Sequence, residues 1–164
     1  MVTIAVVTYN RRLMLQECIN SLLSQDTGED FEIVIVDNCS SDNTAEFMRK
    51  QLNGRIKCIR NETRLSIWDC KKLAIEHSSG DIIAFIDDDC IASKNWLKVT
   101  RVSLSKYDFV GGVVLPTSDT KFPWWWRESL DWLVGINTEP GEKYLPLGSN
   151  IAFRKYVLDT LYKD

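Results

Sequence analysis

Runs of β-branched residues alternate with amphipathic helical patterns along this chain, and the alternation limits the fold more than any other feature. Predicted strands cover residues 2–8, 31–36, 55–59, 81–86 and 109–115, and predicted helices cover 11–25, 41–52, 66–76 and 94–105. This order predicts right-handed β-α-β units. We therefore predict an α/β fold in which helices flank a mostly parallel central sheet.

The last third of the chain is less regular. Residues 116–126 are typical of a loop that ends in an aromatic cluster, and residues 145–153 predict an extended segment before a last helix. The aromatic cluster, Trp124, Trp125 and Trp126, fits core packing, a platform for a sugar or acceptor, or contact with a membrane or partner. Its role stays open at this point.

Length, charge and cysteine usage exclude several classes of protein. The 164 residues favour one compact domain, and a net charge of -3 without a basic cluster makes nucleic acid an unexpected partner. The five cysteines are scattered singly, and the first residues form a strand pattern rather than a signal peptide. No apolar run approaches the roughly 20 residues of a membrane span. We expect a cytoplasmic protein, with peripheral membrane contact and homo-oligomers left open.

Polar residues follow three of the predicted strands. Residues 8–12 (TYNRR) follow the first strand, Asp37 and Asn38 follow the second, and three aspartates at 87–89 follow the fourth. Ligands of such sheets bind at the carboxyl ends of the strands. We therefore expect these polar groups to converge on one edge of the sheet.

The aspartate triplet is the sharpest of these signals. Three adjacent carboxylates repel one another unless a cation lies among them, and oxygen ligands suit Mg²⁺ or Mn²⁺. Alternate side chains of an extended segment point the same way, so Asp87 and Asp89 can face one site. A solvated acidic turn that caps the next helix is the alternative.

The other two strand ends are weaker signals. The carboxylate of Asp37 suits hydrogen bonds from a base or ribose, or simply an Asp-Asn turn. In the segment Thr8-Tyr9-Asn10, the ring of Tyr9 suits contact with a base and a backbone N–H suits a phosphate. Packing of Tyr9 over the sheet edge is the alternative.

Taken together, these segments resemble the family 2 glycosyltransferases of the GT-A fold. The matching stretches, in the order of that family, are VVTYNR at 6–11, VDNCSSDNT at 36–44, SGDIIAFIDDDC at 79–90, NWL at 95–97, GGVVLP at 111–116 and LGSNIAFRK at 147–155. The resemblance covers essentially the whole chain. It implies an inverting, metal-dependent enzyme that moves a sugar from a nucleoside diphosphate to an acceptor hydroxyl.

The resemblance also implies the site residues. Asp87 and Asp89 match the ends of the D-x-D motif that holds Mn²⁺ or Mg²⁺. The expected contacts with the nucleotide sugar are Thr8, Tyr9, Asn10, Arg12, Asp37, Asn38, Arg64, Lys71, Asp87 and Asp88. Those expected beside the sugar and acceptor are Gly148, Ser149, Asn150 and Arg154.

This sequence departs from the family pattern in two places. Where the family has an A-R-N-x-G helix start whose Arg reaches the diphosphate, Lys71 falls on the Arg position and Arg64 competes for its role. The family's acidic base is expected beyond Asp164, so catalytic residues stay unknown. Residues 1–115 then form a nucleotide-sugar-binding half, and 116–164 begin an incomplete acceptor half of one domain.

These features predict a transferase of polysaccharide, cell-envelope or glycoconjugate synthesis. The expected partners are a UDP-, GDP- or dTDP-linked sugar and a saccharide or lipid-linked acceptor. A catalytically inactive nucleotide-sugar-binding module and a nucleotidyltransferase are the alternatives. A dinucleotide or P-loop enzyme is excluded because G-x-G-x-x-G and G-x-x-x-x-G-K-[ST] are absent.

Overall fold

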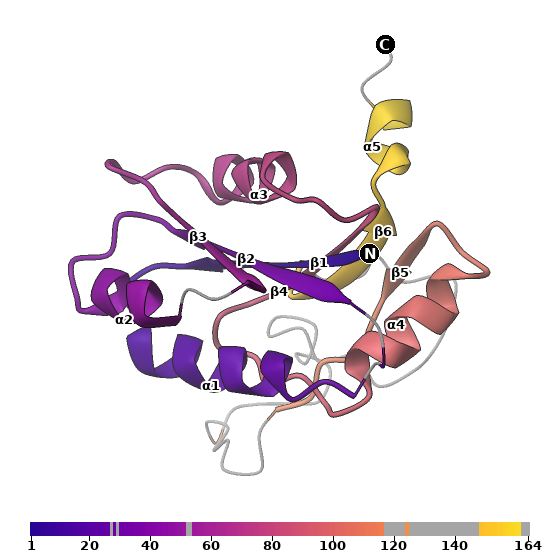
Figure 1. The fold of residues 1–164 in the computed structure, drawn as a ribbon, viewed down its shortest axis with the longest axis horizontal. Coiled ribbons are helices and arrows are strands. Elements are labelled where there is room, and N and C mark those ends of the chain that lie inside the picture. The colour runs from indigo at the N-terminus through magenta and orange to yellow at the C-terminus, as the bar shows by residue number, and fades with distance from the viewer. Residues whose placement is uncertain (27, 29, 52–53, 117–123, 125–147, 162–164) are drawn as a thin grey trace.

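A six-stranded sheet with helices on both faces forms the body of the molecule (Figure 1). The structure is a computed structural model, and it describes residues 1–26, 28, 30–51, 54–116, 124 and 148–161. In chain order the elements are β1 Val2–Thr8, α1 Arg12–Leu23, β2 Phe31–Asp37, α2 Thr44–Gln51, β3 Ile56–Arg60, α3 Ile67–Glu76, β4 Ile82–Ile86, α4 Trp96–Leu104, β5 Phe109–Gly111, β6 Asn150–Arg154 and α5 Tyr156–Leu161.

The strand order is β3-β2-β1-β4-β6-β5. Strands β1 to β4 pair in parallel, whereas β6 runs antiparallel to both β4 and β5. The predicted α/β fold with a mostly parallel sheet is confirmed. The strand predicted at 109–115 is shorter than expected and ends at Gly111. Residues 145–147 of the predicted extended segment lie outside the described residues.

Two apolar layers bury the two faces of the sheet. Ile4 and Val6 of β1 join the cluster under α1 and α4, whereas Ala5 and Val34 join the cluster under α3. Because successive strand residues point to opposite faces, burial of both faces requires nearly continuous apolar runs. Strand β2 meets this requirement, since all seven of its residues are buried.

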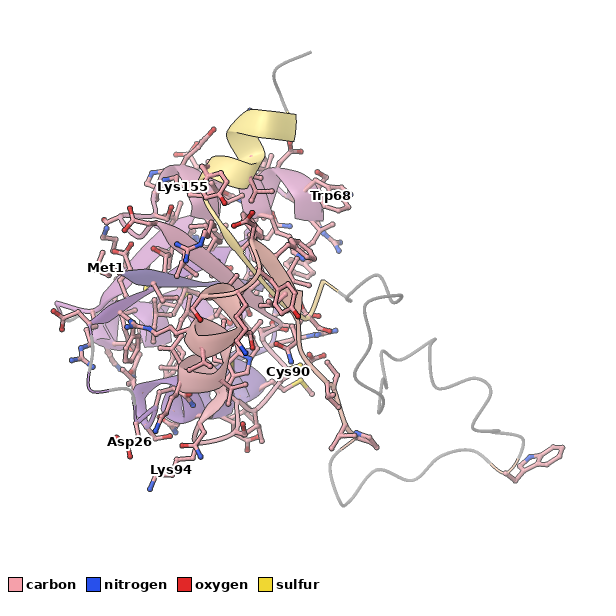
Figure 2. All side chains as sticks on the ribbon, turned by 90° about the vertical axis from the view of Figure 1, so that its right-hand side faces the viewer. Met1, Asp26, Trp68, Cys90, Lys94 and Lys155 are labelled. Carbon is pink, nitrogen blue, oxygen red and sulfur yellow. The ribbon has the colours of Figure 1, made fainter. Side chains whose placement is uncertain are left out.

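Local hydrogen bonds fix the helices that border the strand ends. Helix α3 begins at its N-cap Ser66, whose hydroxyl accepts a hydrogen bond from the N–H of Asp69. The end of α1 and the start of α4 lie side by side, with Asp26 beside Lys94 (Figure 2), and the N–H of Asp26 donates to the carbonyl of Lys94. These bonds set the positions from which α1 and α3 approach the carboxyl ends of the strands.

Candidate functional site

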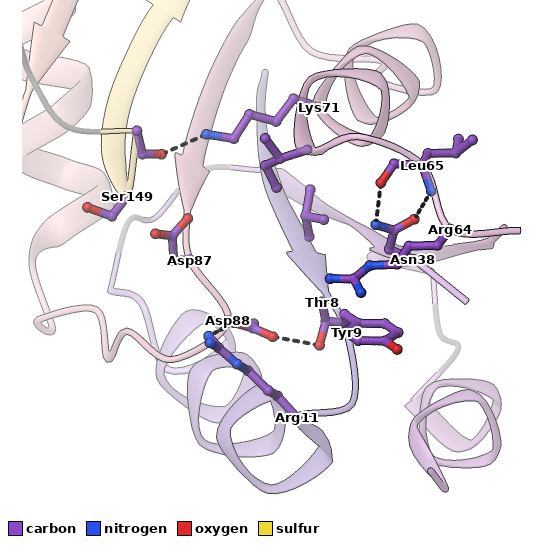
Figure 3. A pocket seen from close by; sticks show the side chains of 13 residues that line it. Thr8, Tyr9, Arg11, Asn38, Arg64, Leu65, Lys71, Asp87, Asp88 and Ser149 are labelled. Carbon is purple, nitrogen blue, oxygen red and sulfur yellow. Dashed lines mark hydrogen bonds and ion pairs between the residues drawn. The ribbon is translucent and has the colours of Figure 1, made fainter. Parts of the chain in front are cut away.

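A cavity of about 620 Å³ lies at the carboxyl ends of β1, β2 and β4, beside the start of α3 (Figure 3). This is the edge that the parallel topology predicts for a ligand, and the volume is typical of a small-molecule site. The lining residues are Val7, Thr8, Tyr9, Arg11, Asn38, Arg64, Leu65, Ile67, Lys71, Asp87, Asp88, Gly148 and Ser149.

Many residues expected from sequence therefore share one cavity. Sequence analysis missed four of the lining residues: Val7, Arg11, Leu65 and Ile67. Arg11 had a usable signal, since it follows β1 among the polar residues of that strand end. The predicted site residues that do not line the cavity are Asn10, Arg12, Asp37, Asp89, Asn150 and Arg154.

Asp88 is buried at the floor of the cavity, and both of its carboxylate oxygens have a hydrogen-bond partner. Its carboxylate accepts hydrogen bonds from Thr8 Oγ1 at 2.7 Å and from Arg11 Nη1 at 3.1 Å. Burial raises the pKa of Asp88, while the bonds from Thr8 and Arg11 act in the opposite direction. The same Arg11 nitrogen lies 2.8 Å from Asp89 Oδ2, and the two carboxylates raise the pKa of Arg11, with the charge of Asp88 the largest cause.

Asp87 differs from both of its neighbours. It lines the cavity and is half-buried, yet among the described residues its carboxylate has no hydrogen-bond or ion-pair partner. Burial raises the pKa of Asp87, and the nearby charge of Lys71 opposes that shift. A desolvated carboxylate without a donor is a group that a cation would stabilise.

A divalent cation in turn needs several oxygen ligands. The described residues contain no group of three or more His, Cys, Asp or Glu placed to hold a metal ion. Mg²⁺ in enzymes is usually held by one or two carboxylates together with substrate phosphates and water. Asp87 and Asp89 supply oxygen ligands of that kind, so the residues fit a metal that arrives with a phosphate ligand.

Lys71 connects α3 to the residues before β6. Its Nζ donates to the carbonyl of Gly148 at 3.1 Å and lies 5.0 Å from the ring centroid of Phe85 (Figure 3). Burial lowers the pKa of Lys71, and Asp87 opposes the shift. The amine thus lies inside the cavity, close to both the free carboxylate and the turn at Gly148.

Arg64 and Tyr9 form the other end of the cavity. The guanidinium carbon of Arg64 lies 4.3 Å from the centroid of the Tyr9 ring, a cation–π contact. Asn38 fixes this end, because its amide exchanges hydrogen bonds of 2.8 and 2.9 Å with the backbone of Leu65. An aromatic ring and a guanidinium therefore lie together at this end of the cavity.

Asp37 and Asn10 shape the loops and do not face the cavity. Asp37 is fully buried, and its carboxylate accepts hydrogen bonds from Arg60 Nη1 at 2.6 Å and from the N–H of Ser40 at 2.9 Å. Asn10 has a φ of 53° and accepts a hydrogen bond from the N–H of Ser41 at 2.7 Å. Their direct contact with a nucleotide, like that of Arg12, stays a prediction.

The predicted sugar and acceptor residues divide into two groups. Gly148 and Ser149 line the main cavity, whereas Asn150 lines a smaller one of about 160 Å³ beside α4. Asn150 accepts a hydrogen bond from Trp96 Nε1 at 2.9 Å, and Arg154 donates to the carbonyl of Leu104 at 2.8 Å. Of the predicted aromatic cluster at 124–126, Trp124 alone is described, and it is 90% exposed.

The mostly parallel sheet, with a cavity at the carboxyl ends of its strands, defines an α/β protein of the class that binds ligands at this edge, and comparison with known proteins gives the family. Residues 3–162 match the family model described as Glycosyl transferase family 2. The chain belongs to glycosyltransferase family 2 and has its GT-A fold. Within the described residues no helix has the length and apolar character needed to cross a membrane.

Curated relatives and solved structures agree with this assignment. The chain is 31% identical to glycosyltransferase AglE of Haloferax volcanii, covering 69% of this chain and 39% of the relative. It is also 31% identical to a glucosyl-dolichyl phosphate glucuronosyltransferase of the same organism, covering 95% and 53%. The chain thus spans about half or less of the length of these relatives.

Two solved structures share the fold. The first is residues 1–349 of TarS from S. aureus, with a TM-score of 0.74 and 22% identity, covering 98% of this chain and 48% of that one. The second is the mannosyltransferase PcManGT from Pyrobaculum calidifontis in complex with GDP-Man and Mn²⁺, with a TM-score of 0.74 and 20% identity. It covers 98% of this chain and 46% of that one.

Proposed function

We propose that the cavity binds a nucleoside-diphosphate sugar, and that the protein transfers the sugar to an acceptor hydroxyl with inversion. Its relatives include an enzyme named for glucose transfer from UDP-Glc to a diphosphoundecaprenol-linked sugar. Cell-envelope or glycoconjugate synthesis is therefore the process we propose for this chain, with a saccharide or a lipid-linked sugar as acceptor.

The observation that carries the proposal is the charge distribution in the cavity. Three cationic side chains, Arg11, Arg64 and Lys71, share the wall with the carboxylate of Asp87, which has no partner among the described residues. A diphosphate matches the positive charges of Lys71 and Arg11, and a divalent cation bound to that diphosphate matches the carboxylate of Asp87. A neutral ligand would leave Asp87 without a partner and Lys71 without an ion pair among the described residues.

Different residues of the cavity are assigned here to the base, the diphosphate and the sugar of the nucleotide sugar. The ring of Tyr9 and the guanidinium of Arg64 are groups on which a base can stack, since bases stack on aromatic rings and guanidinium planes. We assign Lys71 to the diphosphate, and the turn at Gly148 and Ser149 to the sugar, because Lys71 contacts that turn within the same cavity.

Asp87 and Asp89 are the residues that would hold Mn²⁺ or Mg²⁺. The related fold of PcManGT was solved with GDP-Man and Mn²⁺, which supports a divalent cation here. Such an ion, when bound, stabilises as a Lewis acid the negative charge that collects on the leaving nucleoside diphosphate.

The test is calorimetric titration of UDP, GDP and dTDP with Mn²⁺, with Mg²⁺ and with chelator. Two adjacent lysines of α3 provide a matched pair, because Lys71 lines the cavity while Lys72 is an exposed partner of Glu76. We expect Lys71→Ala to weaken nucleotide binding by roughly tenfold or more, the effect of one lost charge-assisted hydrogen bond. Lys72→Ala should change it less than about twofold.

Two outcomes would contradict the proposal. If no nucleoside diphosphate binds under any metal condition, the cavity is not a donor site. If Lys71→Ala and Lys72→Ala weaken binding equally, the cavity is not where the diphosphate binds. Nucleotide binding without sugar transfer or donor hydrolysis would instead favour an inactive nucleotide-sugar-binding module.

A further inference from the structure

Arg11 bridges the last two carboxylates of the aspartate triplet, Asp88 and Asp89. It lies in the loop between β1 and α1, and its Nη1 is 2.8 Å from Asp89 Oδ2 and 3.1 Å from Asp88 Oδ1. Its side chain is half-exposed and lines the same cavity as Lys71 and Arg64. The guanidinium of Arg11 therefore pairs with the aspartate triplet, and the same side chain lines the cavity.

The two carboxylates depend on Arg11 to different degrees. Asp88 is buried and keeps a second hydrogen bond, from Thr8 Oγ1. Asp89 is exposed, and its only strong partner among the described residues is Arg11, since its other contact is a 3.9 Å bond from the thiol of Cys90. Arg11 thus occupies an oxygen of Asp89 that has no other close partner among the described residues.

We propose that Arg11 is a positioning residue that makes metal binding depend on the donor nucleotide. In the free protein its guanidinium holds Asp89 and competes with a divalent cation for that oxygen. The diphosphate offers Arg11 a further anionic partner in the same cavity, so Arg11 can leave Asp89 when the nucleotide enters. This inference rests on the proposed function, since it needs a nucleoside diphosphate in the cavity.

Thermodynamic linkage makes the consequence measurable. If the nucleotide raises the affinity for metal, the metal raises the affinity for nucleotide by the same factor. Removal of the guanidinium should raise the affinity of the nucleotide-free protein for Mn²⁺ and reduce that factor. A merely structural arginine would do neither, because its loss would leave metal affinity unchanged or lower.

The experiment measures Mn²⁺ binding by electron paramagnetic resonance of the free ion, first without nucleotide and then with saturating UDP or GDP. We expect Arg11→Met to bind Mn²⁺ at least about fivefold more tightly than the wild type without nucleotide, at the low end of typical coupling between sites. Arg11→Lys, which keeps a charge but not the bridging fork, should be intermediate. Arg49→Met is the matched control, since it removes the same charge from an exposed position on α2.

The outcomes separate this inference from the proposed function. Equal or weaker Mn²⁺ binding by folded Arg11→Met, with its circular dichroism unchanged, overturns the role of Arg11 even if nucleotide still binds. If Arg11→Met does not fold, Arg11→Lys decides, because affinity equal to that of the wild type overturns the inference. Failure of every variant to bind nucleotide contradicts the proposed function itself.

Discussion

Each end of the parallel sheet carries a carboxylate that is at least partly buried, and the two carboxylates differ in their hydrogen-bond and ion-pair partners. At the amino ends of the strands, Glu32 of β2 accepts hydrogen bonds from Thr3 Oγ1 and from the N–H of Ser79, and it pairs with Lys57 Nζ at 2.7 Å. At the carboxyl ends, Asp87 has no such partner among the described residues. Glu32 thus completes a hydrogen-bond and ion-pair network within the protein, whereas Asp87 remains available to a ligand.

The pKa values of the two groups express this difference. Burial alone would raise the pKa of Glu32, but the bonds from Lys57, Thr3 and Ser79 outweigh it and lower the pKa to about 2. For Asp87 burial dominates and the pKa is raised, against the charge of Lys71. The protein thus gains stability at one edge and gives some up at the other, as expected for a binding site.

The largest effect we expect is on stability at the amino edge. Glu32→Ala would leave the buried hydroxyl of Thr3 and the N–H of Ser79 without their acceptor and would remove the ion-pair partner of the half-exposed Lys57, a loss of about 3 kcal/mol. Thermal unfolding should show a midpoint lowered by roughly 10 °C. Glu17→Ala, at an exposed position of α1, is the control and should stay within about 0.5 kcal/mol. Equal losses in the two variants would show that the Glu32 network adds nothing.

The second effect is the pH dependence of the same network. The folded pKa of Glu32, about 2, lies below its ordinary value of 4.5, so the folded state binds fewer protons than the unfolded state. Its contribution of about 3 kcal/mol is therefore complete above pH 4.5 and is lost as pH falls toward 2. Denaturant unfolding of wild type and Glu32→Gln should converge across this range. A difference that stays constant from pH 7 to pH 2 would contradict it.

The third effect is at the opposite edge and has the opposite character. Asp87→Asn removes a charge that has no partner among the described residues, so stability should be unchanged or higher. Nucleotide binding in Mn²⁺ should weaken by roughly 10- to 100-fold, the effect of a lost charge-assisted contact. Chelator should weaken the wild type toward the level of the variant and leave the variant unchanged. Loss of stability together with affinity would mean that Asp87 is structural.

The sequence predicted the convergence of the site better than its internal pairing. Thr8, Asn38 and Asp87 end three parallel strands, so the topology alone brings them to one edge. The inward turn of Asp37 was not visible, because it depends on Arg60 at the end of the next strand. The bond between Arg11 and Asp89 likewise joins residues 78 positions apart.

The direction of β6 and the length of β5 could also not be predicted from the pattern of apolar residues. The antiparallel course of β6 could not be read from five residues, since alternation of side chains is the same in both directions. Residues 112–115 have the pattern of a strand, but β5 ends at Gly111, although Gly112 and Val113 still hydrogen-bond to Asn150. A Cβ at Gly112 would lie 2.1 Å from Asn150 Nδ2, so only glycine fits there. That crowding comes from β6, far along the chain.

The smallest effect we expect separates the base end of the cavity from its metal end. Arg64→Ala removes the cation that lies over Tyr9 and that we expect to stack on the base. A cation–π contact is worth about 0.5–1 kcal/mol when exposed, so loss of the contact with the base should weaken nucleotide binding by only a few fold. Because this surface faces the proposed base and not the diphosphate, the loss should be the same with Mn²⁺ and with chelator. Arg64→Lys should recover part of it, since a lysine can still lie over the ring. Titrations of UDP, GDP and dTDP would measure the affinity of the wild type and of both variants. A loss confined to Mn²⁺ would place Arg64 on the diphosphate instead, and Lys71 would then no longer be the principal cation for that group.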